Sequence, residues 1–414
     1  MRDSFGLTLR ALVRGHVLTL LLAAVALVHV LFPSIVRADN TVAGWREMFI
    51  RAVPGFVVAV VLVVTLACAC GFFSRERETN RLALTVVRPA SAFSVAVGRW
   101  LALCCVAMIA LTMNAALTFA RLPDAPGCRH HVAPILPPAA TVAREMMEEY
   151  LKDPSTPEAV RKAPRRRVLE LLTNREKDRY DAIVPKESQA WTFPVSGSCS
   201  GLAVRVCFSS ASSMSRSARG TLTFAGLTAV VSNNTQTLVE IPLEGTATGF
   251  SATNSLVFAN TGTVPMMLRP RRDVELLLPA DSFLANLVRA TIQSLAVIAI
   301  LAAFGTFLSS ALSRPVSIFT ALVVLIVALM APDTLDQFTE ELDISLGDRI
   351  GLALSRGVAS VTAAFMAPSP VSDLATGRCI EWTELARTML EDLLVWPAVF
   401  LSLSALLVRR RPLS

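Results

Sequence analysis

Six long apolar runs restrict the fold of this chain more than any other feature of its sequence. They cover roughly residues 16–36, 53–73, 93–120, 285–308, 315–332 and 392–408. A helix needs about 17 to 25 apolar residues to cross the hydrocarbon core of a bilayer, so each run is long enough for one crossing. Charged residues make up only 17% of the 414 residues, against about 25% in soluble domains. The sequence therefore predicts an α-helical polytopic membrane protein with six transmembrane helices.

The first run follows a basic start and could also be a signal peptide. It is longer than the apolar core of about 7 to 15 residues that signal peptides have, and no clear small-x-small cleavage site follows. These features favour an uncleaved span. The preceding FGLTLRALVRG predicts an amphipathic helix on the membrane surface, with Phe5, Leu9 and Leu12 towards lipid.

The placement of arginine predicts that both termini lie in the cytoplasm. Short cytoplasmic loops carry an excess of arginine and lysine. Such an excess is present in four segments, residues 1–15, 74–92, 309–314 and 409–414. The opposite segments, 37–52 and 333–391, mix arginines with many acids. The net charge of +7 is thus explained by cytoplasmic loops and lipid headgroups. No nucleic-acid partner is expected, since no binding motif for one occurs.

This orientation places residues 121–284 outside the cytoplasm as an α+β insert. Residues 140–187 are highly charged and predict two or three short helices. Residues 192–280 contain short alternating segments separated by Ser, Asn, Gly and Thr, which is typical of an antiparallel β-domain. We expect spans one to three in residues 1–120 and spans four to six in residues 285–414. The extracytoplasmic segment 333–391 would lie between the last two spans.

The segment 344–390 could form an amphipathic or half-inserted helix. A seventh full span is disfavoured there, because Asp348, Arg349 and Arg356 would lie in lipid. Arginine and amide side chains also occur in the predicted spans. Arg99 and Arg289 lie near span ends and could extend to the membrane surface. Asn114 and Gln293 lie deeper, where helix packing is preferred to a substrate site as their explanation.

The insert carries candidates for a disulfide and a metal site. Cys199 and Cys207 could form a disulfide in an oxidising compartment, or remain free thiols in a β-core. His130 and His131 could ligate a metal, but adjacent histidines point in different directions and no carboxylate or cysteine sits at helical spacing beside them. A polar loop is the favoured interpretation, and no metal or cofactor is expected.

Catalytic motifs are sparse in this sequence. Gly197-Ser-Cys-Ser-Gly201 has the shape of a nucleophile elbow, which requires a strand, a turn and a helix. Here the segment runs into the alternating pattern LAVRVCF instead. Neither a P-loop nor an H-E-x-x-H motif occurs. We therefore do not expect an enzyme.

The connection between the second and third spans, FSRERETNRLALTVVRPASAFSVAVGRW, is rich in arginine. Residues 74–88 predict a short helix in which Glu78 and Arg81, three residues apart, can pair. Pro89 would end this helix, because the residue before a proline avoids the helical conformation. The helix could lie on anionic lipid as an electrostatic anchor. Alternatively a protein could grip it, and a push on it would then reach both spans.

This connection resembles the loop after the second span in ABC-2 type transporter permeases. That family often shows R-E-x-x-x-x-x-L-x-x-x-x-P-x-S, followed by Gly-Lys or Gly-Arg at the third span. The positions that fit are Arg77-Glu78, Leu84, Pro89, Ser91, Gly98 and Arg99. Six spans, internal termini and the basic ending RRRPLS are also similar. The resemblance covers about residues 1–120 and 285–414, while the insert matches no module that we can name.

The resemblance implies a permease subunit in the bacterial inner membrane, without catalytic residues of its own. A cytoplasmic ABC ATPase subunit would supply the ATP hydrolysis, and a second permease chain would form a homodimer or heterodimer in the lipid bilayer. The residues implied in ATPase coupling are Arg77, Glu78, Arg81, Leu84, Arg88 and Pro89. The main alternative is a membrane scaffold or receptor whose outer domain binds an envelope partner or glycan. An intramembrane hydrolase is disfavoured, because the sequence offers no catalytic pair.

Overall fold

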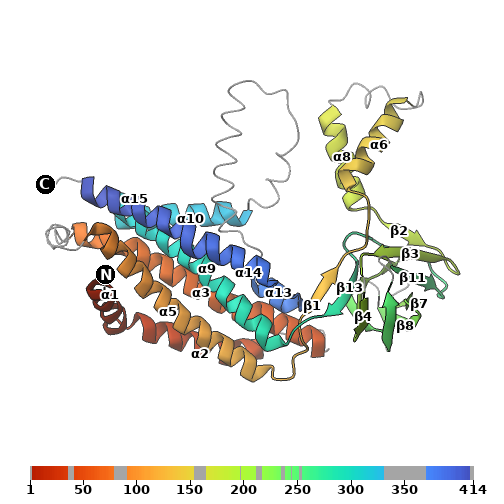
Figure 1. Cartoon of the computed structure of the whole chain (residues 1–414), viewed down its shortest axis with the longest axis horizontal. Coiled ribbons are helices and arrows are strands. Elements are labelled where there is room, and N and C mark those ends of the chain that lie inside the picture. The colour runs from red at the N-terminus through yellow and green to blue at the C-terminus, as the bar shows by residue number, and fades with distance from the viewer. Residues whose placement is uncertain are drawn as a thin grey trace. The chain divides into compact units, whose positions relative to one another are not determined.

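The computed structural model divides the chain into two compact units (Figure 1). It describes residues 2–35, 42–78, 91–152, 165–195, 197–210, 217–234, 238–243, 245–250, 254–330 and 370–410. One unit joins Met1–Gly127 to Ser282–Ser414, and the other is Cys128–Asp281. Each unit has an apolar core of its own.

The first unit is built from helices. They are α1 (Arg2–Arg14), α2 (Val17–Ile35), α3 (Val42–Glu78), α5 (Ala92–Arg121), α9 (Phe283–Ala311), α10 (Arg314–Met330), α13 (Pro370–Thr376), α14 (Trp382–Thr388), the π-helical segment η2 (Met389–Val395) and α15 (Trp396–Arg410). Five helical stretches of the described residues are long and apolar enough to cross a membrane: Val17–Ile35, Trp45–Glu76, Ala92–Arg121, Phe283–Ala311 and Trp382–Arg409. The chain is therefore a multi-pass membrane protein.

The last two predicted spans differ from the helices that form. The predicted span 315–332 falls on α10, a helix of 17 residues whose described side chains end at Ile326. A sixth span thus stays a prediction. The span predicted to start at residue 392 belongs to a helix that begins ten residues earlier, at Trp382. Residues 333–369 of the predicted segment 333–391 lie outside the described residues.

Helix α9 is the centre of this unit, and α3, α5 and α15 pack against it. Its middle is rich in small, fully buried residues such as Ala299, Ala302 and Ala303. Small side chains let helix backbones approach closely in a bilayer, where apolar burial alone does not favour helix association. The indole nitrogen of Trp100 on α5 donates a hydrogen bond to the carbonyl of Ala299 at 2.8 Å. Gly305 makes the closest approach, to Leu66 and Ala69 of α3.

The described residues of the second unit form two helices and thirteen strands. The helices are α6 (Ala139–Lys152) and α8 (Arg165–Lys177). The strands are β1 (Arg129–Val132), β2 (Asp181–Ile183), β3 (Ser188–Phe193), β4 (Gly197–Ser200), β5 (Ala203–Cys207), β6 (Ser209–Ser210), β7 (Ser217–Phe224), β8 (Leu227–Asn234), β9 (Leu238–Pro242), β10 (Thr246–Phe250), β11 (Asn254–Asn260), β12 (Met266–Leu268) and β13 (Val274–Pro279). Both helices lie within the segment predicted to be helical, apart from Ala139. The antiparallel β-region predicted for the insert is confirmed.

Two four-stranded sheets share one apolar core in this unit. Their strand orders are β1-β13-β5-β9 and β3-β11-β7-β8. The buried side chains alternate along the strands, as on β11, where Leu256 and Phe258 point inward. Phe193 of β3 and Phe224 of β7 meet edge to face in the same core, with ring centroids 6.4 Å apart. The alternation seen in the sequence thus reflects one face of each sheet turned to this core.

The close packing of α3 on α9 gives a stability prediction. A Cβ at Gly305 would lie 2.9 Å from the Cβ of Ala69 and 3.1 Å from a methyl of Leu66. We expect Gly305→Leu to destabilise the purified protein, because overpacking costs about 1–3 kcal/mol or more and exceeds the gain in helix propensity. The measurement is the thermal unfolding midpoint in detergent. Gly6→Leu is the matched control, since a Cβ there meets nothing within 4 Å, and a similar drop for both variants would contradict the prediction.

Candidate functional site

The structure describes both ends of the arginine-rich connection. Residues 74–78 do not start a separate helix but continue α3 to Glu78. Arg77 and Glu78 therefore lie on the last turn of α3. The other predicted coupling residues, Arg81, Leu84, Arg88 and Pro89, lie outside the described residues.

An ion pair joins the two helices that flank the connection. Arg99 of α5 pairs with the carboxylate of Glu76 on α3, and only 9% of the Arg99 side chain is exposed. The Arg99 guanidinium also lies 4.5 Å from the ring centroid of Phe73, where the ring face attracts a cation. The position of Arg99 near a span end would allow it to extend to the membrane surface. In the structure it is instead buried against α3, where Glu76 supplies a counter-charge that the spacing of the apolar runs does not reveal.

Helix α1 packs on the start of α5. Ser91 caps α5 by accepting a hydrogen bond from the backbone N–H of Ser94 at 3.1 Å. A Cβ at Gly98 would lie 3.0 Å from both Ser4 and the backbone nitrogen of Phe5. The hydroxyl of Ser4 donates to the carbonyl of Val95 at 3.2 Å. The glycine of the permease-like motif thus allows the backbones of α1 and α5 to touch.

This contact corrects the expected position of the first helix. Leu12 is buried, and Phe5 and Leu9 pack against the apolar core of the helical unit. The apolar side of α1 therefore faces the protein and not lipid. We call the ion pair Glu76–Arg99 together with the contact of α1 at Gly98 the α3–α5 bracket.

The bracket is connected to the central helix. The hydroxyl of Ser309, in the last turn of α9, accepts a hydrogen bond from the backbone N–H of Phe73 at 2.7 Å. Phe73 is the residue whose ring lies under the Arg99 guanidinium. A displacement of the C-terminal end of α3 would therefore act directly on α9 through this hydrogen bond.

The opposite end of α9 is held by a second polar cluster. The side-chain amide of Asn286 donates to the carbonyl of Arg378 at 2.8 Å and accepts from the N–H of Ile380 at 2.9 Å. Arg289 donates to the carbonyl of Ile380 at 3.1 Å, and its guanidinium lies 4.4 Å from the ring centroid of Trp382. Arg289 is thus buried among these partners and does not use the possibility of extending to the surface. These contacts fix the turn between α13 and α14 on the start of α9.

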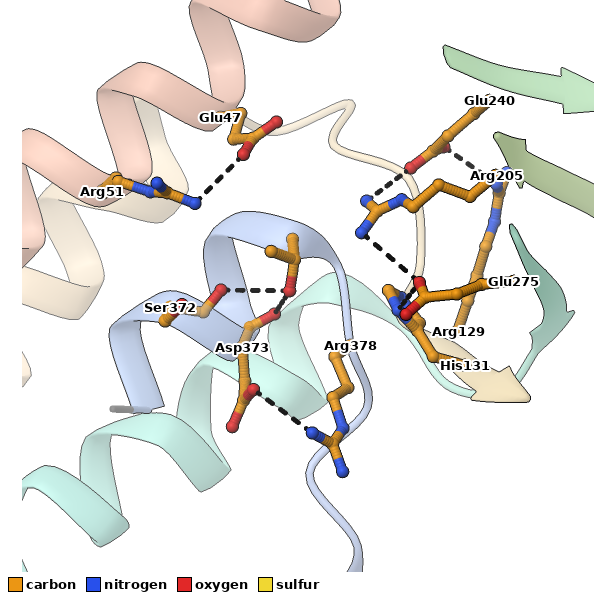
Figure 2. A network of polar contacts seen from close by, with 11 residues as sticks. Glu47, Arg51, Arg129, His131, Arg205, Glu240, Glu275, Ser372, Asp373 and Arg378 are labelled. Atoms are coloured by element: carbon orange, nitrogen blue, oxygen red, sulfur yellow. Dashed lines mark hydrogen bonds and ion pairs between the residues drawn. The ribbon is translucent and has the colours of Figure 1, made fainter. Parts of the chain in front are cut away.

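The insert carries a network of charges across one sheet (Figure 2). Arg205 of β5 pairs with Glu240 of β9 at 2.8 Å and approaches Glu275 of β13 at 4.0 Å. Arg129 and His131 of β1 pair with Glu240 and Glu275, each at 3.0 Å. The register places Glu275, Arg205 and Glu240 opposite one another, so the network ties four strands together on the side away from the core.

The histidine pair does not form a metal site with described groups. His131 is engaged by Glu275, whereas His130 is exposed on the other side of β1. The polar loop expected here is instead strand β1, in which adjacent positions point to opposite faces. Within the described ranges, no group of three His, Cys, Asp or Glu side chains could hold a metal ion.

The described part of the cysteine pair is a free thiol. Cys207 is unbonded at the end of β5, and burial, followed by the nearby charge of Asp273, raises its pKa. The thiol form therefore predominates at neutral pH. Of the two alternatives that the sequence leaves open, the free thiol is thus the one found at Cys207; Cys199 lies on β4, and its side chain is outside the described set. Gly201, with φ of 76°, separates β4 from β5, and the elbow-like sequence therefore lacks the helix that a nucleophile elbow needs.

Comparisons with known proteins give no match. No protein-family model fits the sequence, and no curated protein or solved structure is significantly similar to it. A function therefore has to be inferred from the residues and contacts of the chain itself.

The ion pair of the bracket gives a second stability prediction. We expect Glu76→Gln to lower the thermal unfolding midpoint, because it leaves the buried charge of Arg99 uncompensated. In a double-mutant cycle with Arg99→Gln, the two residues should be coupled by about 0.5–3 kcal/mol. The pair Glu47–Arg51 on the same helix is the control. Its side chains are 38% and 57% exposed, so its coupling should be about 0.5 kcal/mol or less, and equal coupling of both pairs would exclude a special role for the bracket.

Proposed function

We propose that this chain is the membrane-spanning permease subunit of an ABC transporter, which moves a substrate across the cell membrane with ATP hydrolysed by a separate subunit. The observation that carries the proposal is the α3–α5 bracket. It joins the flanks of a connection that resembles the ATPase-contacting loop of ABC-2 permeases. Arg99 and Gly98, two residues of the resembling motif, are the ones that make the bracket.

The proposed arrangement has six spans with both termini in the cytoplasm, in the bacterial inner membrane. The insert 121–284 then lies outside the cytoplasm. Two such chains, or this chain and a homologue, line a central pathway. Two cytoplasmic ATPases contact residues 74–88 and α1, with Arg77, Glu78, Arg81, Leu84, Arg88 and Pro89 in the contact surface.

The bracket explains how force on the connection would reach the spans. When the ATPases close on ATP, they press on a segment whose two flanks are locked together by Glu76 and Arg99. The hydrogen bond from Phe73 to Ser309 passes the movement to α9. At the other end, Asn286 and Arg289 carry it to the turn before α14. The chain moves as connected helices and needs no catalytic residue of its own.

A membrane scaffold or receptor is the second candidate. The separate unit Cys128–Asp281, with its own core, favours it, because a binding domain needs only anchoring helices. Such an anchor, however, has no need of a bracket between α3 and α5 or of a central helix tied at both ends. The permease therefore explains more of the helical unit.

The deciding experiment is affinity purification of the tagged chain from native membranes in mild detergent, with all co-purifying proteins identified. The permease predicts a stoichiometric P-loop ATPase. An envelope protein in its place, without an ATPase, would favour the scaffold and move the function to the insert.

A charge reversal in the connection tests the contact surface. We expect Arg77→Glu combined with Leu84→Asp to abolish association with the ATPase while membrane insertion remains intact, because both the basic and the apolar side of the contact are lost. The readout is co-purification of the ATPase at equal yield of the chain. Arg51→Glu, near the other end of α3 and 57% exposed, is the control and should leave association unchanged. Wild-type recovery of the ATPase with the double variant would refute the assignment.

A further inference from the structure

Helix α9 and the continuous helix from α14 through η2 to α15 run side by side. At one end, Arg289 of α9 lies 4.4 Å from the ring centroid of Trp382. Further along, the rings of Phe304 and Phe307 lie 5.4 Å and 6.1 Å from that of Phe400. From the first contact to the second, residue numbers increase along both helices. The two helices are therefore parallel neighbours over this length.

An acid is buried on the surface that the second helix turns towards α9. Asp392 is only 3% exposed, and it precedes Trp396 and Phe400 at the four-residue spacing of one helix face. It lies at the start of the apolar run 392–408, after the charged residues Glu384, Arg387 and Glu391 of the same helix. Burying an ionisable side chain is costly unless it is paired. The π-helical segment around it is itself rare and is frequently found at functional sites.

No described cation neutralises this acid. Among the residues that the structure describes, none forms a hydrogen bond or an ion pair with Asp392. Arg387 pairs with the neighbouring Glu391 at 2.9 Å on the exposed side of the helix. Arg289 is held against Trp382. Trp382 lies ten residues before Asp392, which is about 15 Å along the helix axis at 1.5 Å per residue.

A second polar group on the facing helix lacks a partner. Gln293 of α9 is fully buried, and both its amide oxygen and its amide nitrogen have no hydrogen-bond partner in the described part of the chain. Gln293 precedes Phe304 by eleven residues, or about three turns, and so shares its helix face. The amide therefore lies on the surface turned to the helix Trp382–Arg410, about 8 Å along the helix axis from the level of Asp392 at 1.5 Å per residue. Leaving such a group unsatisfied costs about 1–3 kcal/mol.

The remaining side chains of this surface are aromatic. Trp396 stacks near Phe400 with centroids 6.1 Å apart, and Phe400 also contacts Phe304 and Phe307. Aromatic faces attract cations, most strongly where water is excluded. A divalent metal ion would instead require several oxygen ligands, and no described group of three acidic, His or Cys side chains exists.

We propose that Asp392, Gln293 and the four aromatic residues bind an organic cation with an apolar body between α9 and the helix Trp382–Arg410. Asp392 supplies the counter-charge, the rings enclose the apolar part, and Gln293 satisfies a polar atom of the ligand. This inference rests on the proposed function, in which the cation is the transported substrate. The ligand lies beside α9, the helix that is coupled to the α3–α5 bracket at Ser309.

The test is equilibrium binding of radiolabelled tetraphenylphosphonium to the full chain in lipid nanodiscs, with partitioning into empty nanodiscs subtracted. Tetraphenylborate, of the same shape and opposite charge, is the ligand control. We expect saturable binding of the cation alone. Asp392→Asn should weaken it at least about tenfold, which corresponds to about 1.4 kcal/mol, whereas Asp392→Glu should retain most of the affinity. Glu391→Gln removes the neighbouring exposed carboxylate and should have no effect.

Gln293→Leu provides an independent arm if Asp392→Asn fails to fold, and it should weaken binding severalfold. Non-saturable uptake, equal binding of tetraphenylborate, or wild-type affinity in the Asp392→Asn variant would overturn the proposal. Co-purification of the ATPase, followed on the same variants, separates the two claims. An associated ATPase without cation binding would support the permease function and reject this binding site. Cation binding without an ATPase would support the binding site and reject a role in ATP-driven transport.

Discussion

Polar side chains buried among these helices must find partners inside the protein, because the hydrocarbon core of a bilayer offers none. This constraint organises the helical unit. Arg99 is matched by Glu76, and Arg289 is matched by a backbone carbonyl and the ring of Trp382. His29 of α2 lies 3.4 Å from the hydroxyl of Thr118 on α5. Each pairing joins two separate elements, so satisfying the polar groups also fixes which helices are neighbours.

The pairings are unevenly distributed along α9. Its first turns form hydrogen bonds to the turn before α14, and its last turn forms a hydrogen bond to α3. Between these ends, Gln293 has no described partner for its amide, and Asp392 on the neighbouring helix has no described counter-charge. Helix α9 is thus fixed at both ends and has unsatisfied polar groups near its middle. In the proposed site, a ligand would supply the missing partners for these groups. Movement at the bracket would then alter the same surface that holds the ligand.

The sequence predicted the apolar helices and the antiparallel β-region well, because length, hydropathy and alternation are local properties. The sequence did not predict the positions of buried charged side chains, because these depend on partners from distant parts of the chain. Arg99 and Arg289 could have extended to the membrane surface, and nothing beside them in the sequence indicates Glu76 or Trp382 as their partners. The burial of Asp392 could not be predicted either, because it depends on the packing of separate helices. Of the bracket, the motif identified Arg99 and Gly98, but Glu76 could be recognised as the partner only from the packing of α3 on α5.

The insert is structurally separate from the helices to which transport is assigned. The chain enters and leaves this unit through β1 and β13, which pair with each other. The pairing continues to the edge of the unit, where the backbone N–H of Cys128 donates a hydrogen bond to the carbonyl of Asp281 at 2.8 Å. The two covalent links to the helical unit are therefore adjacent, and the insert interrupts no helix. Its charged network stabilises its own sheet. The bracket and the polar middle of α9 consist wholly of residues outside the insert, so a role in transport does not depend on the partner of the insert.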